Sequence, residues 1–76
     1  MIMVRNNVKQ RRAQHGPRGV SQAHLARQVG VSRSYLHRLE QQERQPSAEV
    51  MFKIARYFKC GVEEVFFYLP NGSTEP

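Results

Sequence analysis

The first half of this 76-residue chain contains no acidic residue. Residues 1–39 hold eight of the twelve Lys and Arg residues and neither Asp nor Glu. Residues 40–76 hold the other four basic residues and all six Glu, so the two parts carry +8 and −2 and together give the net charge of +6. A cationic surface confined to one half of the chain favours a polyanionic partner such as nucleic acid.

Other shortages exclude several classes of protein. A single cysteine, Cys60, cannot form an internal disulfide and fits a reducing cytoplasm. No apolar run approaches the length of a membrane span, and the start of the chain is too short for a signal peptide, so we expect a cytoplasmic protein without a membrane partner. The chain has room for one small core and shows no Ser/His/Asp or paired-carboxylate arrangement, so we expect neither catalysis nor a cofactor.

The stretch from Ser21 to Glu40 predicts two short helices joined by a tight turn. Ser21 and Ser32 are good N-caps, because their hydroxyls can accept a backbone N–H one turn further on. Gly30 can end the first helix in a left-handed conformation without steric cost. The inward stripe of the first helix is expected to consist of Leu25, Ala26 and Val29.

The second of these helices divides its residues between two faces. Leu36 and Leu39 share one side of it. The opposite side is polar and consists of Arg33, Ser34, His37 and Arg38. A polar, arginine-bearing helix braced on a neighbour is what reading base edges in a major groove requires, so the pattern predicts a helix-turn-helix.

Several segments, in this order and spacing, resemble the Xre-like, or lambda-repressor-like, helix-turn-helix transcription regulators. They are VKQRR (8–12), SQAHLARQVGVSRSYLHRLE (21–40), RQPS (44–47), FKIARYF (52–58) and GVEEVF (61–66). The resemblance implies an all-α, compact five-helix domain with the helix-turn-helix at helices 2 and 3. It also implies sequence-specific binding of double-stranded DNA by a small transcription regulator, a repressor. Because one recognition helix covers only a few base pairs, we expect a homodimer on a palindromic operator.

Periodicity gives the extent of each helix. We expect helices over Val4–His15, Gln22–Val29, Arg33–Gln41 and Val62–Phe66, and one that Ser47 caps and whose apolar stripe reaches Phe58. In the first helix, Val4, Val8 and Ala13 are expected to face inward. The domain should therefore comprise residues 1–69, with 70–76 as a flexible tail and no segment left for a small-molecule effector domain.

The exposed face of the second helix of the motif carries the expected base contacts. Arg33, Ser34 and Arg38 are the candidates, since an arginine fork matches the two major-groove acceptors of guanine. His37 lies one turn beyond Arg33 and should touch either a base or a phosphate. For Tyr35, at the edge of this face, two roles are open: its hydroxyl meets a phosphate, or its ring packs on the preceding helix.

Further residues are expected to contact DNA phosphates. The resemblance assigns that role to Gln22, at the first position of helix 2, where free backbone N–H groups also favour an anion. Additional phosphate contacts from loops are expected at Arg18, Arg44 and Ser47. Such contacts fix the register of a protein on DNA without reading its sequence.

Arg12 and Glu40 have a structural interpretation. In the family, an arginine of helix 1 pairs with the glutamate that ends helix 3, and these two residues match that spacing. Metal binding is not expected, because the residues that might supply ligands follow no common zinc pattern; they are His15, His24, His37 and Cys60. Cys60 is expected to be a small buried hydrophobe.

Two positions depart from the family at the ends of helices. Gln41-Gln42 stands where Asn-Gly is common, and Lys59 replaces a usual glycine. Glutamine resists the left-handed conformation that glycine adopts freely, so we expect an altered turn after Glu40 and a remodelled end of helix 4.

The most apolar stretch, Val-Phe-Phe-Tyr-Leu at 65–69, predicts a dimer interface through Val65, Phe67, Tyr68 and Leu69. Two geometries are open: helix 5 packs against its symmetry mate, or residues 67–69 pair with it as a short strand. The alternative to an interface is that the rings of Phe67 and Tyr68 fold back onto helix 1 of the same chain.

Two other functions stay open at this stage. An antitoxin-like or other protein-interaction module would bind DNA as part of a complex, and would copurify with a second protein. A nonspecific or RNA-binding basic protein is the weaker alternative, because the sequence shows no aromatic stacking surface.

Overall fold

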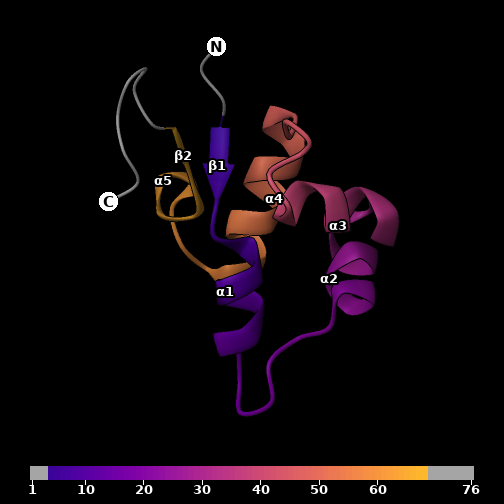
Figure 1. Cartoon of the computed structure of the whole chain (residues 1–76). Helices are drawn as coiled ribbons and strands as arrows, with labels where there is room; N and C mark the ends of the chain where they lie inside the picture. Colours follow the sequence, from indigo (N-terminus) through magenta and orange to yellow (C-terminus); the bar gives the residue numbers. More distant parts are fainter. Residues whose placement is uncertain (1–3, 69–76) are drawn as a thin grey trace.

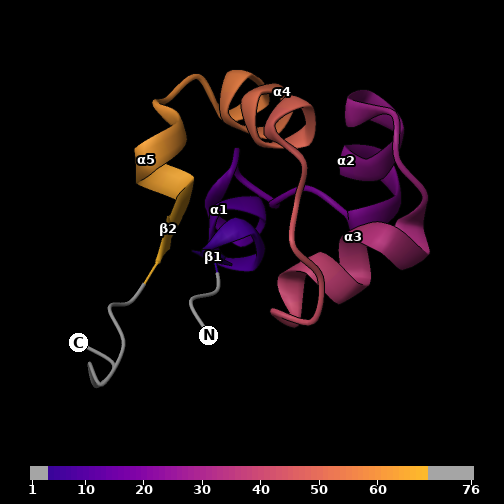
Figure 2. The ribbon, with the colours of Figure 1, turned by 90° about the horizontal axis from the view of Figure 1, so that it is seen from above.

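The computed structural model describes residues 4–68 and contains five helices and two short strands. In chain order these elements are β1 (Val4–Asn6), α1 (Val8–Gln14), α2 (Gln22–Val29), α3 (Arg33–Glu40), α4 (Ala48–Phe58), α5 (Val62–Val65) and β2 (Phe66–Tyr68). Helices α2 and α3 lie on one side of the molecule, and α5 and β2 lie on the opposite side (Figures 1 and 2). No described helix is long and apolar enough to cross a bilayer.

The expectation of an all-α fold is corrected by a small sheet. β1 and β2 pair antiparallel with Arg5 opposite Phe67, which joins the two ends of the described chain (Figure 1). Residues 4–6 are therefore a strand, and the first helix begins at Val8 instead of Val4. Two contacts set this boundary. The pairing of Val4 with Tyr68 holds residues 4–6 extended, and the Asn6 Oδ1 accepts the backbone N–H of Val8 at 3.1 Å, a side-chain bond that starts a helix there.

One hydrophobic core receives side chains from all five helices. Its fully buried members are Val8, Leu25, Leu36, Leu39, Ile54 and Val65. Burying a side chain of this size stabilises the fold by about 1.5–3 kcal/mol, so these contacts fix how the helices cross. Ala13, which was expected to face inward, is exposed, because five helical positions turn it about 140° away from the buried Val8.

Three serines begin helices α2, α3 and α4 as the sequence predicts. The Oγ atoms of Ser21, Ser32 and Ser47 accept the backbone N–H three residues later, at 3.0, 3.0 and 3.2 Å. Each cap satisfies a donor that would otherwise have no partner at the start of its helix. The starts of the helix-turn-helix are therefore fixed by the local sequence.

Two helix ends use left-handed residues that are not glycine. Lys59 has φ 58° at the end of α4, and Gln42 has φ 66° just after α3. The end of α4 is thus not remodelled: the Lys59 N–H bonds the carbonyls of Ala55 and Arg56 as a glycine in that place would. α3 ends at Glu40, one residue earlier than predicted, and the turn after it also keeps the glycine-like geometry.

The loop from α1 to α2 depends on Gly19. Its φ is +75°, and a Cβ at this position would lie 3.1 Å from the carbonyl oxygens of Arg12 and Ala13. The next residue, Val20, donates its N–H to the Arg12 carbonyl at 2.9 Å. The loop therefore turns back tightly against the end of α1, which holds Arg18 outside it as an exposed side chain.

Candidate nucleic-acid interface

The outward face of α3 carries the four side chains predicted to touch DNA bases. All four are exposed: Arg33, Ser34, His37 and Arg38. On the opposite face, Leu36 and Leu39 are fully buried against the core. Because α2 packs against α3, the structure presents this polar face on a helix that cannot roll without exposing two leucines.

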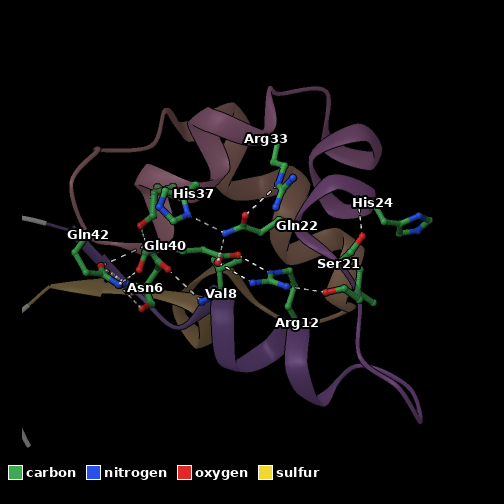
Figure 3. A network of polar contacts seen from close by, with 12 residues as sticks. Asn6, Val8, Arg12, Ser21, Gln22, His24, Arg33, His37, Glu40 and Gln42 are labelled. Atoms are coloured by element: carbon green, nitrogen blue, oxygen red, sulfur yellow. Dashed lines mark hydrogen bonds and ion pairs between the residues drawn. The ribbon is translucent and has the colours of Figure 1, made fainter.

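A buried ion pair fixes the inner face of α3 to α1. Arg12 donates from Nε to the Glu40 Oε2 at 2.7 Å and from Nη2 to Oε1 at 2.9 Å, and its Nη1 donates to the Val20 carbonyl at 2.9 Å (Figure 3). The side chain of Glu40 is only 1% exposed and that of Arg12 15%. The hydrogen bond to Glu40 raises the pKa of Arg12, against the opposing effect of burial. The pair predicted from the sequence is therefore present, with the two-bond geometry of an arginine fork.

Gln22 extends this network to the exposed face. Its Nε2 donates to the Glu40 Oε1 at 3.0 Å and lies 3.3 Å from the His37 Nδ1 (Figure 3). Its Oε1 accepts a long bond of 3.5 Å from the Arg33 Nε. The side-chain amide thus connects the buried carboxylate with two outward residues of α3, a positioning contact that the sequence reading missed.

The residues expected at phosphates surround the two helices. Ser47 caps α4, and its hydroxyl hydrogen remains free to donate because the oxygen is the acceptor of the cap. Tyr35 is half-buried and packs against the core, which supports the second of its two open roles. The Arg44 guanidinium lies 4.7 Å from the centre of the Tyr35 ring, so a cation–π contact orders this candidate phosphate-binding side chain.

Three residues with structural roles near α3 were not identified from the sequence. Asn6 is buried, and its Nδ2 donates to the Leu39 carbonyl in the last turn of α3 at 2.8 Å. Gln42 and Gln45, in the loop after α3, bond the backbone of β1. The role of Asn6 could have been predicted, because an asparagine two residues before a helix can bond the first backbone N–H groups of that helix. No local pattern indicated that the two glutamines would bond β1.

The structure separates the residues predicted at the dimer interface. Val65 is a fully buried core residue, so its assignment to an interface is corrected: its side chain is occupied within the chain. Phe67 is 44% exposed on β2, and the backbone of Tyr68 continues that strand. Leu69 lies outside the described residues. Residues 66–68 are extended, but they pair with β1 of the same chain.

The described residues contain no group of three His, Cys, Asp or Glu side chains that could hold a metal ion. His15 and His24 instead contact the Tyr57 ring, with ring centres 5.2 and 6.4 Å apart. Cys60 is half-buried and packs against the core, the role of a small hydrophobe.

Comparisons with known proteins agree with this geometry. Residues 8–65 match the helix-turn-helix family. An HTH-type transcriptional regulator of Methanocaldococcus jannaschii is 35% identical over 65 residues, which cover 86% of this chain and 94% of that protein. An HTH-type transcriptional regulator of Archaeoglobus fulgidus is 34% identical over 65 residues, 86% of this chain and 89% of its own length.

A solved structure shares the fold. The crystal structure of the transcriptional regulator VanUg superimposes with a TM-score of 0.68 at 24% sequence identity, covering 92% of this chain and 89% of that one. Because the alignment spans nearly the whole of both chains, the likeness extends to the fold as a whole.

Proposed function

Because this chain belongs to the Xre-like, or lambda-repressor-like, helix-turn-helix family of DNA-binding transcriptional regulators, we propose that it is a sequence-specific repressor that inserts α3 into the major groove. The observation that carries this proposal is the exposed polar face of α3 opposite two fully buried leucines. Arg33 and Arg38 are then placed to bind guanine, with Ser34 and His37 beside them. We also propose that the protein acts in the cytoplasm.

Phosphate contacts would surround this face. Arg18 and Arg44 supply positive charge from loops, and Ser47 and the backbone N–H groups at the start of α2 supply donors. In this proposal Gln22 contributes chiefly by orienting Arg33 and His37. Glu40 accepts from one of the two N–H bonds of its amide nitrogen, the His37 Nδ1 lies 3.3 Å from the same nitrogen, and the Gln22 Oε1 accepts from Arg33. Tyr35 contributes by ordering Arg44.

Selection from a pool of random duplexes tests the proposal. The protein should enrich one palindromic sequence and bind it about a thousandfold or more tightly than random DNA at physiological salt. Titrations at several salt concentrations should give similar, steep slopes for both duplexes, because the phosphate contacts are shared. Equal affinity for selected and random DNA would instead assign the protein to nonspecific nucleic-acid binding.

We also propose a homodimer that forms at β2. β2 pairs on one side with β1 and has no second neighbour among residues 4–68, and Phe67 is exposed beside it. An open strand edge next to an exposed aromatic ring suits strand pairing with a second copy. Two copies would read the two halves of a palindrome, which one short helix cannot do.

Phe67→Asp should convert the dimer into a folded monomer. Arg5 faces Phe67 in the sheet register, so the new carboxylate meets a cation and the fold should persist. Phe52→Asp is the matched control, because Phe52 is 64% exposed on α4, which is not part of the sheet. Sedimentation at tens of micromolar should give a dimer for the wild type and for the control. A monomeric wild type, or a dimeric Phe67→Asp variant, would contradict this interface.

A further inference from the structure

The outer edge of β1 is already occupied by side chains. Arg5 and Phe67 are register partners, and the Asn7 N–H bonds the Val65 carbonyl at 3.1 Å, so the odd-numbered residues of this segment bond toward β2. The backbone groups of Val4 and Asn6 must then point the other way. These are the N–H and carbonyl groups that a further strand would use.

Two glutamine amides bond these backbone groups. The Val4 N–H donates to the Gln45 Oε1 at 2.9 Å, and the Gln45 Nε2 donates back to the Val4 carbonyl at 3.3 Å. The Asn6 N–H donates to the Gln42 Oε1 at 3.0 Å, and the Gln42 Nε2 donates back to the Asn6 carbonyl at 3.0 Å. Because a side-chain amide presents a donor beside an acceptor as a peptide group does, the two glutamines take the place of a third strand.

Both glutamines lie in the loop that follows α3. Gln42 adopts a left-handed backbone, φ 66°, that a glutamine rarely takes without compensating contacts. Its Nε2 also bonds the Glu40 carbonyl at 3.2 Å, and Asn6 bonds the Leu39 carbonyl at 2.8 Å (Figure 3). The last turn of α3 and the strand β1 are therefore connected by hydrogen bonds in both directions.

We propose that Gln42 and Gln45 form an amide clamp that closes the β1 edge and fixes the sheet to the end of α3. A second copy of this chain can then add only at β2, and the pairing there sets the distance between the two copies of α3. This inference rests on the proposed homodimer. It makes both glutamines positioning residues: they touch no base and determine the spacing of half-sites that the dimer accepts.

The two functions of the clamp separate physically. Each copy of α3 stays in place through its leucines and the Arg12–Glu40 pair, so binding to a single half-site does not need the clamp. The half-sites of a palindrome are about 34 Å, one turn of DNA, apart. Matching that distance needs a rigid path from one α3 through both sheets to the other. Within each chain, the clamp and the bond from Asn6 to the Leu39 carbonyl are the hydrogen-bonded parts of that path.

Amide hydrogen exchange tests the clamp by itself. Gln45→Ala should speed exchange of the Val4 amide, and Gln42→Gly that of the Asn6 amide, by about tenfold or more. Glycine is chosen at position 42 because it takes φ 66° without strain. The core amide of Leu39 should not change, and the control Gln41→Ala, an exposed neighbour, should leave every one of these rates as in the wild type. Unchanged Val4 and Asn6 rates in the two variants would overturn the clamp.

DNA binding tests its consequence. The duplex selected in the previous section is compared with versions in which the half-site spacing is longer or shorter by one base pair, and with a single half-site. The Gln42→Gly/Gln45→Ala variant should lose the wild-type preference for the selected spacing by about tenfold or more, with half-site affinity unchanged. A retained preference, or an equal loss on the half-site, would overturn the positioning role. A monomeric wild type would refute the dimer and with it the role of the clamp in half-site spacing. The exchange rates of the Val4 and Asn6 amides would still show whether the clamp exists.

Discussion

The two faces of α3 differ in burial and in how many of their side chains are bonded within the protein. The inner face holds Leu36, Leu39 and Glu40, all buried, and its one charge is bonded by Arg12 and Gln22. The Arg38 side chain, on the outer face, makes no hydrogen bond or ion pair within residues 4–68. The inner face of α3 therefore serves stability and the outer face serves recognition. Substitutions on the inner face should lower the Tm, and substitutions on the outer face should weaken DNA binding.

Glu40→Ala should produce the largest effect, on stability. It leaves the largely buried Arg12 guanidinium without its carboxylate and removes the carboxylate oxygen that accepts from Gln22. Breaking a buried pair by deleting one partner costs about 3–5 kcal/mol, a large share of the stability of a domain this small. Thermal unfolding should therefore show a much lower Tm than for Glu43→Ala, an exposed carboxylate three residues later.

A pH titration of stability cannot replace the Glu40→Ala substitution, because the titration of Arg12 falls far above neutral pH. The pKa of Arg12 is raised by the hydrogen bond to Glu40. While Glu40 is ionised, the stabilisation linked to the titration of Arg12 is fully present below the ordinary arginine pKa and is lost as the pH rises through the raised value. Glu40→Gln provides the finer comparison, since it removes the charge and keeps one acceptor. Equal Tm values for Glu40→Ala and Glu43→Ala would show that the inner face does not depend on the pair.

Substitution on the outer face should change DNA binding and leave the fold intact. Arg38→Ala and Arg33→Ala should each weaken binding to the selected duplex by about 1–3 kcal/mol and binding to random DNA much less. Arg56→Ala, an exposed arginine near the end of α4, is the control for loss of one positive charge. Binding titrations on both duplexes measure the difference. An equal loss on both would assign that arginine to a phosphate.

How much of this could be predicted from the sequence differs along the chain. The helix-turn-helix was predictable because its signals are local: Ser21 and Ser32 cap, Gly30 ends a helix, and apolar spacing marks the inner faces. The first helix was extended too far because Val4 pairs with a residue more than sixty positions away, which no local pattern contains. Long-range pairing overrides helix propensity in such a segment.

The turn after α3 shows the same limit in the site. Replacement of a common Asn-Gly by Gln41-Gln42 suggested an altered turn, yet Gln42 keeps the left-handed geometry. The compensation comes from hydrogen bonds to Asn6, 36 residues away. Lys59 adopts a similar left-handed conformation, and its side chain is exposed. Side-chain hydrogen bonds therefore support the left-handed backbone of Gln42 but not that of Lys59.

The smallest expected change in stability gives the closest comparison of the two faces of α3, because it uses two serines only two positions apart. The Ser32 Oγ accepts the Tyr35 N–H at 3.0 Å, whereas Ser34 is exposed on the outer face. Ser32→Ala should therefore destabilise the protein by about 1 kcal/mol, as loss of a helix cap does, which corresponds to a Tm lower by roughly 4–8 °C. Ser34→Ala should leave Tm unchanged and relax the base preference in a repeated selection. If both variants lowered Tm equally, or if only Ser32→Ala changed the selected sequence, the division of α3 into a stabilising face and a reading face would be wrong.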